Sequence, residues 1–466
     1  MDELTAVYAT GGVIVGYFLL QVVRKRFDPF APTWMFLLGW VQIYVIQPIT
    51  LHEYALRVRG IEVTTEANVR ALWAVVLFLV CYHFGPGRSA SRIVPAPPAR
   101  WSLAALVAIC PVLVVWGLVC GFYIARSVTT TERVQLDPEA VLLLQFPILT
   151  LVAAILLIVT GRSLERPRPL VALMGLSISA FYILLWMFNG KRSVSLLAVL
   201  ATVCAWYVPK FKRPSWPTLA VTALAGALAV SISIGWRNDR KHERSITGFV
   251  EHMMEFDPGL ILLNLNIESE TEENAPDFGY KSYETLEYGG YLLMLSTVPE
   301  LSDYDYGAPY LRIVSTFIPR ILWPDKPLYG RDAWIAAWIA GSEFRRKPDF
   351  TGPAIGILGA CQLNGGAVAT AIVIGFLGVF LRSAYEYYRA NAHKPWAQAW
   401  WALTFYNAWF MTVNDDPFVW FYYAYGFTTF PPLVALWLYN KLAEAGRPVE
   451  VEHDGSLGIS AVAPLV

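Results

Sequence analysis

Long apolar runs separated by short polar segments dominate the chain. Eleven of these runs are long enough to cross about 30 Å of hydrocarbon as helices. They lie near residues 5–23, 32–50, 68–84, 101–123, 141–160, 170–189, 193–208, 217–235, 366–384, 398–413 and 417–440. The pattern predicts an all-α polytopic membrane protein with about 11 transmembrane helices.

One long polar excursion divides this series. We expect four parts: transmembrane helices 1 to 8 in residues 1–235, a large outer loop in 236–353, helices 9 to 11 in 354–440 and a tail in 441–466. A loop of this length exceeds an ordinary connection and points to a function of its own.

The large loop contains further apolar or amphipathic stretches. They lie at 248–266, 288–300, 308–323 and 332–344. In the last one, Trp334, Ile335, Trp338 and Ile339 recur at helical spacing. We expect short amphipathic helices that lie on the membrane as a lid. The alternative, an independent globular domain, is less favoured because the pieces are short and apolar.

Composition supports a membrane protein. The chain is 56% hydrophobic and 15% charged, whereas about a quarter of the residues are charged in soluble domains. The net charge of +0 argues against nucleic acid as a partner.

The distribution of charge predicts the orientation. Asp2 and Glu3 precede the first apolar run and Arg24, Lys25 and Arg26 follow it, so this run is a retained span and not a cleaved signal peptide. With the amino terminus outside and the carboxyl terminus in the cytoplasm, the short inner segments carry seventeen Lys and Arg residues and the short outer connections seven. This bias follows the positive-inside rule and supports a multi-pass protein in that orientation.

Several familiar chemistries find no support in the sequence. The five cysteines form no CxxC pair, and HExxH, GxSxG and P-loop motifs are missing. We therefore expect no disulfide, no metal and no cofactor.

Cationic side chains gather on the predicted outer side in three clusters. The first is Gly190-Lys191-Arg192, a tight turn between the sixth and seventh runs. The second is Arg237, Arg240 and Arg244, which share one face if the eighth helix continues through them. The alternatives are ordinary snorkelling towards headgroups for the turn, and for the arginines a solvated helix end paired with Asp239 and Glu243.

The third cluster lies in the strip 317–327. Prolines at 319, 324 and 327 stiffen it, Arg320 and Lys326 give it fixed charge, and Trp323 and the following Arg331 complete the set. Because guanidinium groups match phosphate oxygens, the strip suits a lipid-linked pyrophosphate. The alternative is a proline-rich turn between interfacial helices.

A general base is harder to choose. His242 and His252 are candidates, each beside a carboxylate (Glu243 and Glu251), and the alternative for both is a solvated loop histidine. Two acidic side chains of the outer loop are further candidates, Asp325 and Glu343.

The strip Pro319-Arg320-x-x-Trp323-Pro324-Asp325-Lys326-Pro327 resembles the P-R-x-x-W-P-x-K-P signature of bacterial oligosaccharide repeat-unit polymerases, the Wzy-type O-antigen and exopolysaccharide polymerases. The turn at Gly190-Lys191-Arg192 and the late periplasmic loop are similar to features of the same family, over about residues 170–385. One departure is Ala360, which stands where relatives often carry a glutamate.

The resemblance implies a GT-C-like glycosyltransferase that needs no metal and no nucleotide sugar. It also implies a bacterial inner membrane, with the amino terminus periplasmic and the carboxyl terminus cytoplasmic. The enzyme would join undecaprenyl-pyrophosphate-linked oligosaccharide repeat units into a surface polysaccharide, with a flippase and a chain-length regulator as partners. Arg237, Arg240, Arg320 and Lys326 would stabilise the leaving pyrophosphate, and Lys191, Arg192, Arg244, Trp323 and Arg331 would bind substrate. The alternatives are an O-antigen ligase, for which a histidine of the outer loop would be needed, and a flippase or transporter of lipid-linked glycans.

Overall fold

The computed structural model describes residues 3–98, 101–129, 143, 146–239, 241–243, 245–257, 286–311, 322–323, 354–413 and 429–445. Within these ranges the regular elements are helices, without a strand. Seven helices of the described ranges are long and apolar enough to cross a membrane. The prediction of a helical membrane protein is confirmed at this level.

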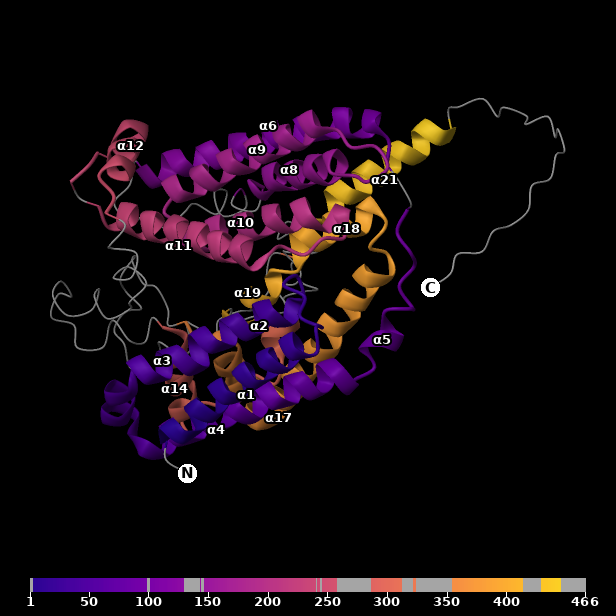
Figure 1. Cartoon of the computed structure of the whole chain (residues 1–466). Helices are drawn as coiled ribbons and strands as arrows, with labels where there is room; N and C mark the ends of the chain where they lie inside the picture. Colours follow the sequence, from indigo (N-terminus) through magenta and orange to yellow (C-terminus); the bar gives the residue numbers. More distant parts are fainter. Residues whose placement is uncertain are drawn as a thin grey trace.

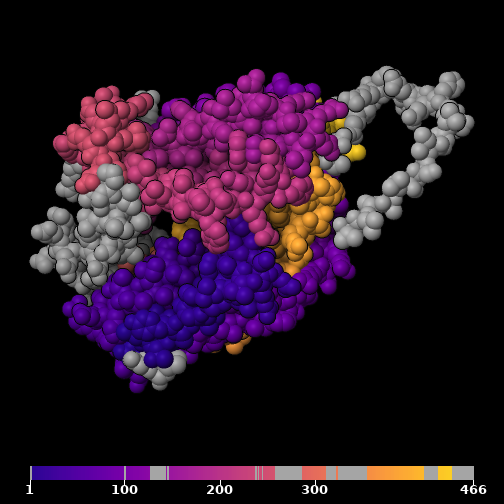
Figure 2. All heavy atoms as spheres, in the orientation of Figure 1, coloured from indigo at the N-terminus to yellow at the C-terminus, as the bar shows by residue number. Residues whose placement is uncertain are grey.

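The helices form two bundles that lie alongside one another (Figure 1), and the space-filling view of Figure 2 shows them as two adjoining bodies. The first bundle contains α1 (Glu3–Val23), α2 (Pro32–Val41), η1 (Gln42–Ile46), α3 (Gln47–Thr50), α4 (His52–Phe84), α5 (Gly87–Ala90), α14 (Glu287–Thr297) and α17 (Gly356–Ala390). The second contains α6 (Leu103–Thr129), α8 (Ile148–Gly161), α9 (Pro169–Phe188), α10 (Arg192–Tyr207), η2 (Val208–Lys210), α11 (Trp216–Asn238), α12 (Ile246–Met254) and α21 (Phe430–Ala445). The short η4 (Ala308–Leu311) follows α14 in the chain.

Two short helices connect the bundles. α18 (Pro395–Thr404) packs against α8 and α10 of the second bundle, and α19 (Asn407–Val413) packs against α2 of the first. Buried aromatic residues fill this junction; Trp401, for example, donates a hydrogen bond from Nε1 to the Phe30 carbonyl at 3.2 Å. The bundles are thus joined by packed side chains as well as by the chain itself.

Each predicted apolar run overlaps a helix, but the lengths differ from run to run. The second run is divided into α2, η1 and α3, the tenth into α18 and α19, and α8 has 14 residues. Eleven spans therefore remain a prediction beside the seven long helices that the described ranges contain.

Two helices extend far beyond their apolar runs. α4 has 33 residues with a break at Gly60 (φ 80°), and α17 has 35 residues with a break at Gly365 and Gly366 (φ 150° and 62°). These positive φ values are accessible to glycine without the steric cost that a side chain would add. Glycine thus permits each of these long helices to change direction.

The location of α14 differs from the expected lid. Instead of lying on a surface, α14 packs against α4 and α17, and Tyr288 and Tyr291 are almost completely buried. Gln47 accepts from the Tyr288 backbone N–H at 2.8 Å and donates to Glu287 at 2.7 Å, and the Tyr288 hydroxyl donates to Asn68 at 2.8 Å. Because these bonds satisfy the polar groups at the start of α14, part of the long loop can belong to the core of the first bundle.

The turn between α9 and α10 is as tight as its sequence predicts. Gly190 has φ 65°, its N–H bonds the Met187 carbonyl at 2.9 Å, and the Lys191 N–H bonds the Trp186 carbonyl at 3.0 Å. This pair of bonds is a Schellman motif, which ends a helix sharply at a glycine. α9 and α10 are therefore neighbours, and Lys191 and Arg192 are exposed at their shared end.

Candidate functional site

The candidate site is built where α11 ends. Trp236 in the last turn of α11 is buried, and Asp239 directly after the helix has extended backbone angles (φ −67°, ψ 123°). α11 thus ends at Asn238, so the continuous helix on which the expected face of the second cationic cluster depends stops before Arg240. Arg240 and Arg244 themselves lie outside the described residues.

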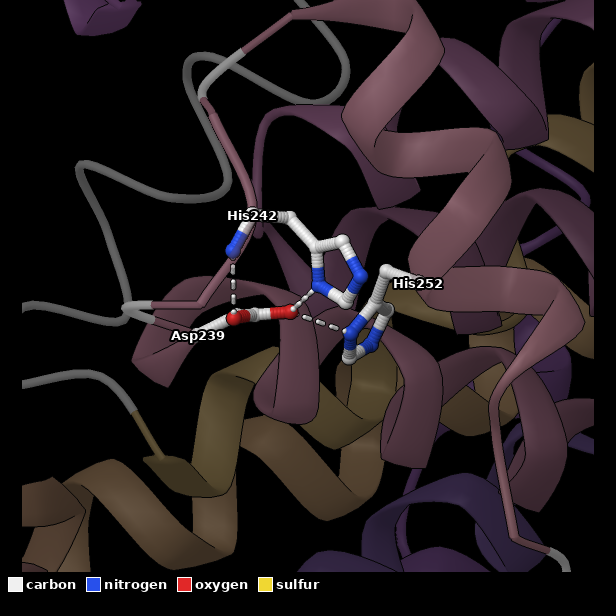
Figure 3. Close-up of side chains that lie close together, drawn as sticks. All are labelled: Asp239, His242 and His252. Carbon is white, nitrogen blue, oxygen red and sulfur yellow. Dashed lines mark hydrogen bonds and ion pairs between the residues drawn. The ribbon is translucent and has the colours of Figure 1, made fainter.

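Asp239 brings together two histidines that are ten residues apart in the chain (Figure 3). Its Oδ2 atom lies 2.8 Å from His242 Nδ1 and 2.7 Å from His252 Nδ1. Its Oδ1 atom accepts the backbone N–H of Lys241 at 2.7 Å and that of His242 at 3.2 Å. Because an ionised carboxylate only accepts hydrogen bonds, both imidazoles carry their N–H at Nδ1 in this arrangement.

The surroundings keep Asp239 ionised. Burial favours the neutral acid, since the side chain is only 8% exposed. The hydrogen bonds from His242, from the two backbone N–H groups and from His252 outweigh burial and hold the pKa of Asp239 well below its usual range. At neutral pH, Asp239 is therefore a fixed anion between two imidazoles.

Local sequence places His252 at this carboxylate. Ser245 caps α12 by accepting the Gly248 N–H at 3.1 Å, and the bend before it lets the short helix fold back on α11. The buried Phe249 packs against Trp236, whose ring also lies 5.7 Å from the ring of His252. Trp236 and Phe249 thus fix the angle at which α12 presents His252.

The same aromatic contacts bring the α9–α10 turn close to the histidines. Trp236 donates from Nε1 to the Phe188 carbonyl at 2.7 Å, and the Phe188 ring packs on both Trp236 and Phe249. Phe188 ends α9, three residues before Lys191. The first predicted cationic cluster and the two histidines therefore lie at the same end of the second bundle.

The two histidines differ at their outer nitrogens. His252 Nε2 is buried and has no hydrogen-bond partner within the described ranges. A Cβ added to Gly235 would lie 3.2 Å from this atom, so glycine leaves room for the ring. His242 Nε2 instead lies 3.6 Å from Glu255 Oε2, and Glu255 also pairs with Lys241. His252 Nε2 thus holds a buried lone pair without a partner in the described ranges, while His242 lies between two carboxylates.

The sequence identified both histidines and missed their partner. Glu243 and Glu251, the expected neighbours, are exposed, and Asp239 receives both Nδ1 hydrogen bonds. One signal was available: Asp239 stands three residues before His242 at a predicted helix end, where an aspartate readily bonds the following backbone N–H groups.

The other predicted site residues are placed only in part. Lys191 and Arg192 are exposed, Trp323 is half-buried, and Arg237 lies in the last turn of α11. The remaining predicted residues, and the side chain of Arg237, lie outside the described part of the chain: Arg240, Arg244, Arg320, Asp325, Lys326, Arg331 and Glu343.

Chemically, this arrangement can accept a proton at His252 Nε2 or hold a cation among Oδ2 and the two Nδ1 atoms.

A scan against protein-family profiles, a search of curated proteins and a search of solved structures each find no match to the chain.

Proposed function

We propose that the protein is a glycosyltransferase that joins lipid-pyrophosphate-linked oligosaccharide repeat units on the outer face of a bacterial inner membrane. The observation that carries the proposal is the Asp239–His252 pair, a base with a fixed tautomer at the end of a membrane-spanning bundle. The resemblance of the strip 317–327 to repeat-unit polymerases supports the choice of substrate.

In the proposed reaction the acceptor sugar first displaces the groups that bury His252 Nε2. Nε2 then removes the proton of an acceptor sugar hydroxyl. The hydroxyl oxygen attacks the reducing-end carbon of the donor glycan, and the bond from that carbon to the pyrophosphate oxygen breaks. Asp239 stabilises the imidazolium that forms, since its Oδ2 lies 2.7 Å from His252 Nδ1. The lipid pyrophosphate leaves with the electron pair.

Cations of the outer side would stabilise the charge of this leaving group. The proposal assigns that role to Arg237, Arg240, Arg320 and Lys326, because phosphate oxygens match guanidinium and ammonium donors. Lys191 and Arg192 are exposed at the end of α9 and α10 near the histidines, and would bind the pyrophosphate in a secondary way.

Ligase activity is the second candidate. A ligase would use the same donor and base but transfer the finished glycan to a different acceptor. The paired histidine of the outer segment favours this reading as much as it favours the polymerase, whereas the signature-like strip favours the polymerase.

One structural feature favours a transporter: the break in α17 at Gly365 and Gly366, since broken helices line the central sites of many transporters. However, the part of α17 from Gly366 to Ala390 is long enough by itself to cross about 30 Å. The break therefore falls at the end of a complete span and not at its middle, and the enzyme remains the better account.

A cellular experiment tests the proposal. Deleting the gene should leave single lipid-linked repeat units and remove long chains, and a plasmid carrying His252→Gln should fail to restore them at normal protein abundance. A normal ladder of chain lengths from the His252→Gln strain would refute the assigned base. Finished chains that accumulate on the lipid carrier would instead identify the ligase.

A further inference from the structure

We propose that Asp239, His242 and His252 also form a binding site for one divalent transition-metal ion of the Zn²⁺ class. One ligand atom from each of the three residues lies within 4.8 Å of the others. The prospective ligands are Asp239 Oδ2 and the two Nδ1 atoms, which lie 2.8 Å (His242) and 2.7 Å (His252) from Oδ2. This assignment departs from the sequence-based expectation of no metal.

The donor set suits such an ion. Two imidazole nitrogens and one carboxylate oxygen are ligands that Zn²⁺, Fe²⁺ and similar ions share, and three protein ligands leave a coordination position open. Zn²⁺ with bonds of about 2.0–2.1 Å keeps its ligand atoms roughly 3.3 Å apart. The present separations of 2.7 and 2.8 Å are those of hydrogen bonds, so the side chains must part slightly when an ion replaces the two protons.

Hydrogen bonds orient one of the ligands, and a second carboxylate lies close to another. Asp239 Oδ1 is fixed by the backbone N–H groups of Lys241 and His242, which leaves Oδ2 directed at the imidazoles. An ion on His242 Nδ1 would leave the proton on Nε2, which lies 3.6 Å from Glu255 Oε2. A carboxylate behind a ligating histidine is the usual second contact in metal sites.

His242 provides an independent reason for the site. If its proton is on Nδ1, the lone pair of Nε2 faces the Glu255 carboxylate, which is unfavourable for a neutral imidazole. Either a second proton or an ion at Nδ1 removes this conflict. Either one also offsets part of the charge of Asp239, and Zn²⁺ binding distinguishes the ion from the second proton.

Metal binding and base catalysis exclude each other at His252. An ion on Nδ1 places the proton on Nε2, and the lone pair that would accept the hydroxyl proton is lost. We therefore expect Zn²⁺ to inhibit glycan transfer, an expectation that rests on the proposed function.

The binding experiment needs no activity. The full chain, purified in detergent with a tag free of histidine and freed of metal by a chelator, is titrated with Zn²⁺ by equilibrium dialysis and with Co²⁺ by visible absorption. We expect one tight site per chain, and at least tenfold weaker binding after Asp239→Asn, His242→Ala or His252→Ala. His393→Ala, which removes an exposed histidine of another turn, should bind like the wild type.

A variant that keeps all three ligands separates an effect on metal binding from unfolding of the protein. Glu255 is largely exposed, and Glu255→Gln should weaken Zn²⁺ binding about tenfold without removing a ligand. Wild-type binding no tighter than that of the three ligand variants would overturn the site. Inactivity of the metal-free protein would count against the proposed function alone, and full activity at saturating Zn²⁺ would overturn the inhibition.

Discussion

Replacing Asp239 by asparagine tests the chemistry with little change in shape. In the new side chain the carbonyl oxygen is needed at the Oδ1 position, where two backbone N–H groups donate. The amide NH₂ then occupies the Oδ2 position and donates to His252 Nδ1. The imidazole must therefore carry its proton on Nε2, which converts the base into a donor.

We expect a large fall in kcat, because Asp239→Asn keeps the position of the His252 imidazole but reverses its tautomer. General base catalysis contributes about 100- to 10,000-fold to a rate. We therefore expect Asp239→Asn to lower kcat by about this factor, equivalent to about 3–5 kcal/mol of transition-state stabilisation. KM for the lipid-linked substrate should change little, since Asp239 contacts the histidines and the backbone.

The assay follows glycan length after incubation of purified variants with lipid-linked repeat units. Glu243→Gln and Glu251→Gln are matched controls, because each removes an exposed carboxylate next to a histidine in sequence. Both controls should retain wild-type activity. A kcat of Asp239→Asn within threefold of the wild type would refute the role of the Asp239–His252 pair.

Further predictions concern other positions. Gly235→Ala places a Cβ 3.2 Å from His252 Nε2 and should lower kcat about tenfold, since displacing a catalytic group by 1 Å can lower a rate about 100-fold. Gly16→Ala has open space around the new Cβ and should leave kcat unchanged. Equal activity of the two variants would contradict the role of the His252 position. Gly290→Ala places a Cβ 2.0 Å from a backbone carbonyl before α17 and should cost about 1–3 kcal/mol of stability, seen as a lower thermal unfolding temperature in detergent; an unchanged temperature would contradict the packing of α14. Arg320→Ala should leave single repeat units at normal protein abundance, and a normal ladder of chain lengths would remove Arg320 from the site.

Hydrophobic runs predicted the helices well because burial in lipid requires continuous apolar stretches with internal hydrogen bonds. The turn at Gly190 was equally predictable, since a glycine between two apolar runs commonly ends a helix in a Schellman motif. The parts of helices that extend beyond the apolar runs were not predictable. The first turns of α17 contain polar residues such as Gln362 and Asn364, which are buried and donate hydrogen bonds to backbone carbonyls.

α14 shows why part of the loop was misjudged. Its sequence is apolar enough for a membrane surface, and nothing local distinguishes a surface helix from a buried one. The distinction depends on Gln47 and Asn68, which lie more than 200 residues away in sequence and pair with Tyr288 at the start of the helix.

The candidate site was predicted by residue type and not by partner. Histidines of an outer segment beside carboxylates suggested a base, but adjacency in sequence pointed to Glu243 and Glu251. Asp239 becomes the partner only because α11 stops at Asn238 and α12 folds back through the contact of Phe249 with Trp236.

Transfer by the purified protein in lipid vesicles, with lipid-pyrophosphate-linked repeat units as the only glycan, tests whether the protein is a glycosyltransferase with His252 as its base. We expect polymer of several repeat units from the wild type and only single units from His252→Gln. Absence of polymer from the folded wild-type protein, or equal polymer from the wild type and His252→Gln, would contradict it.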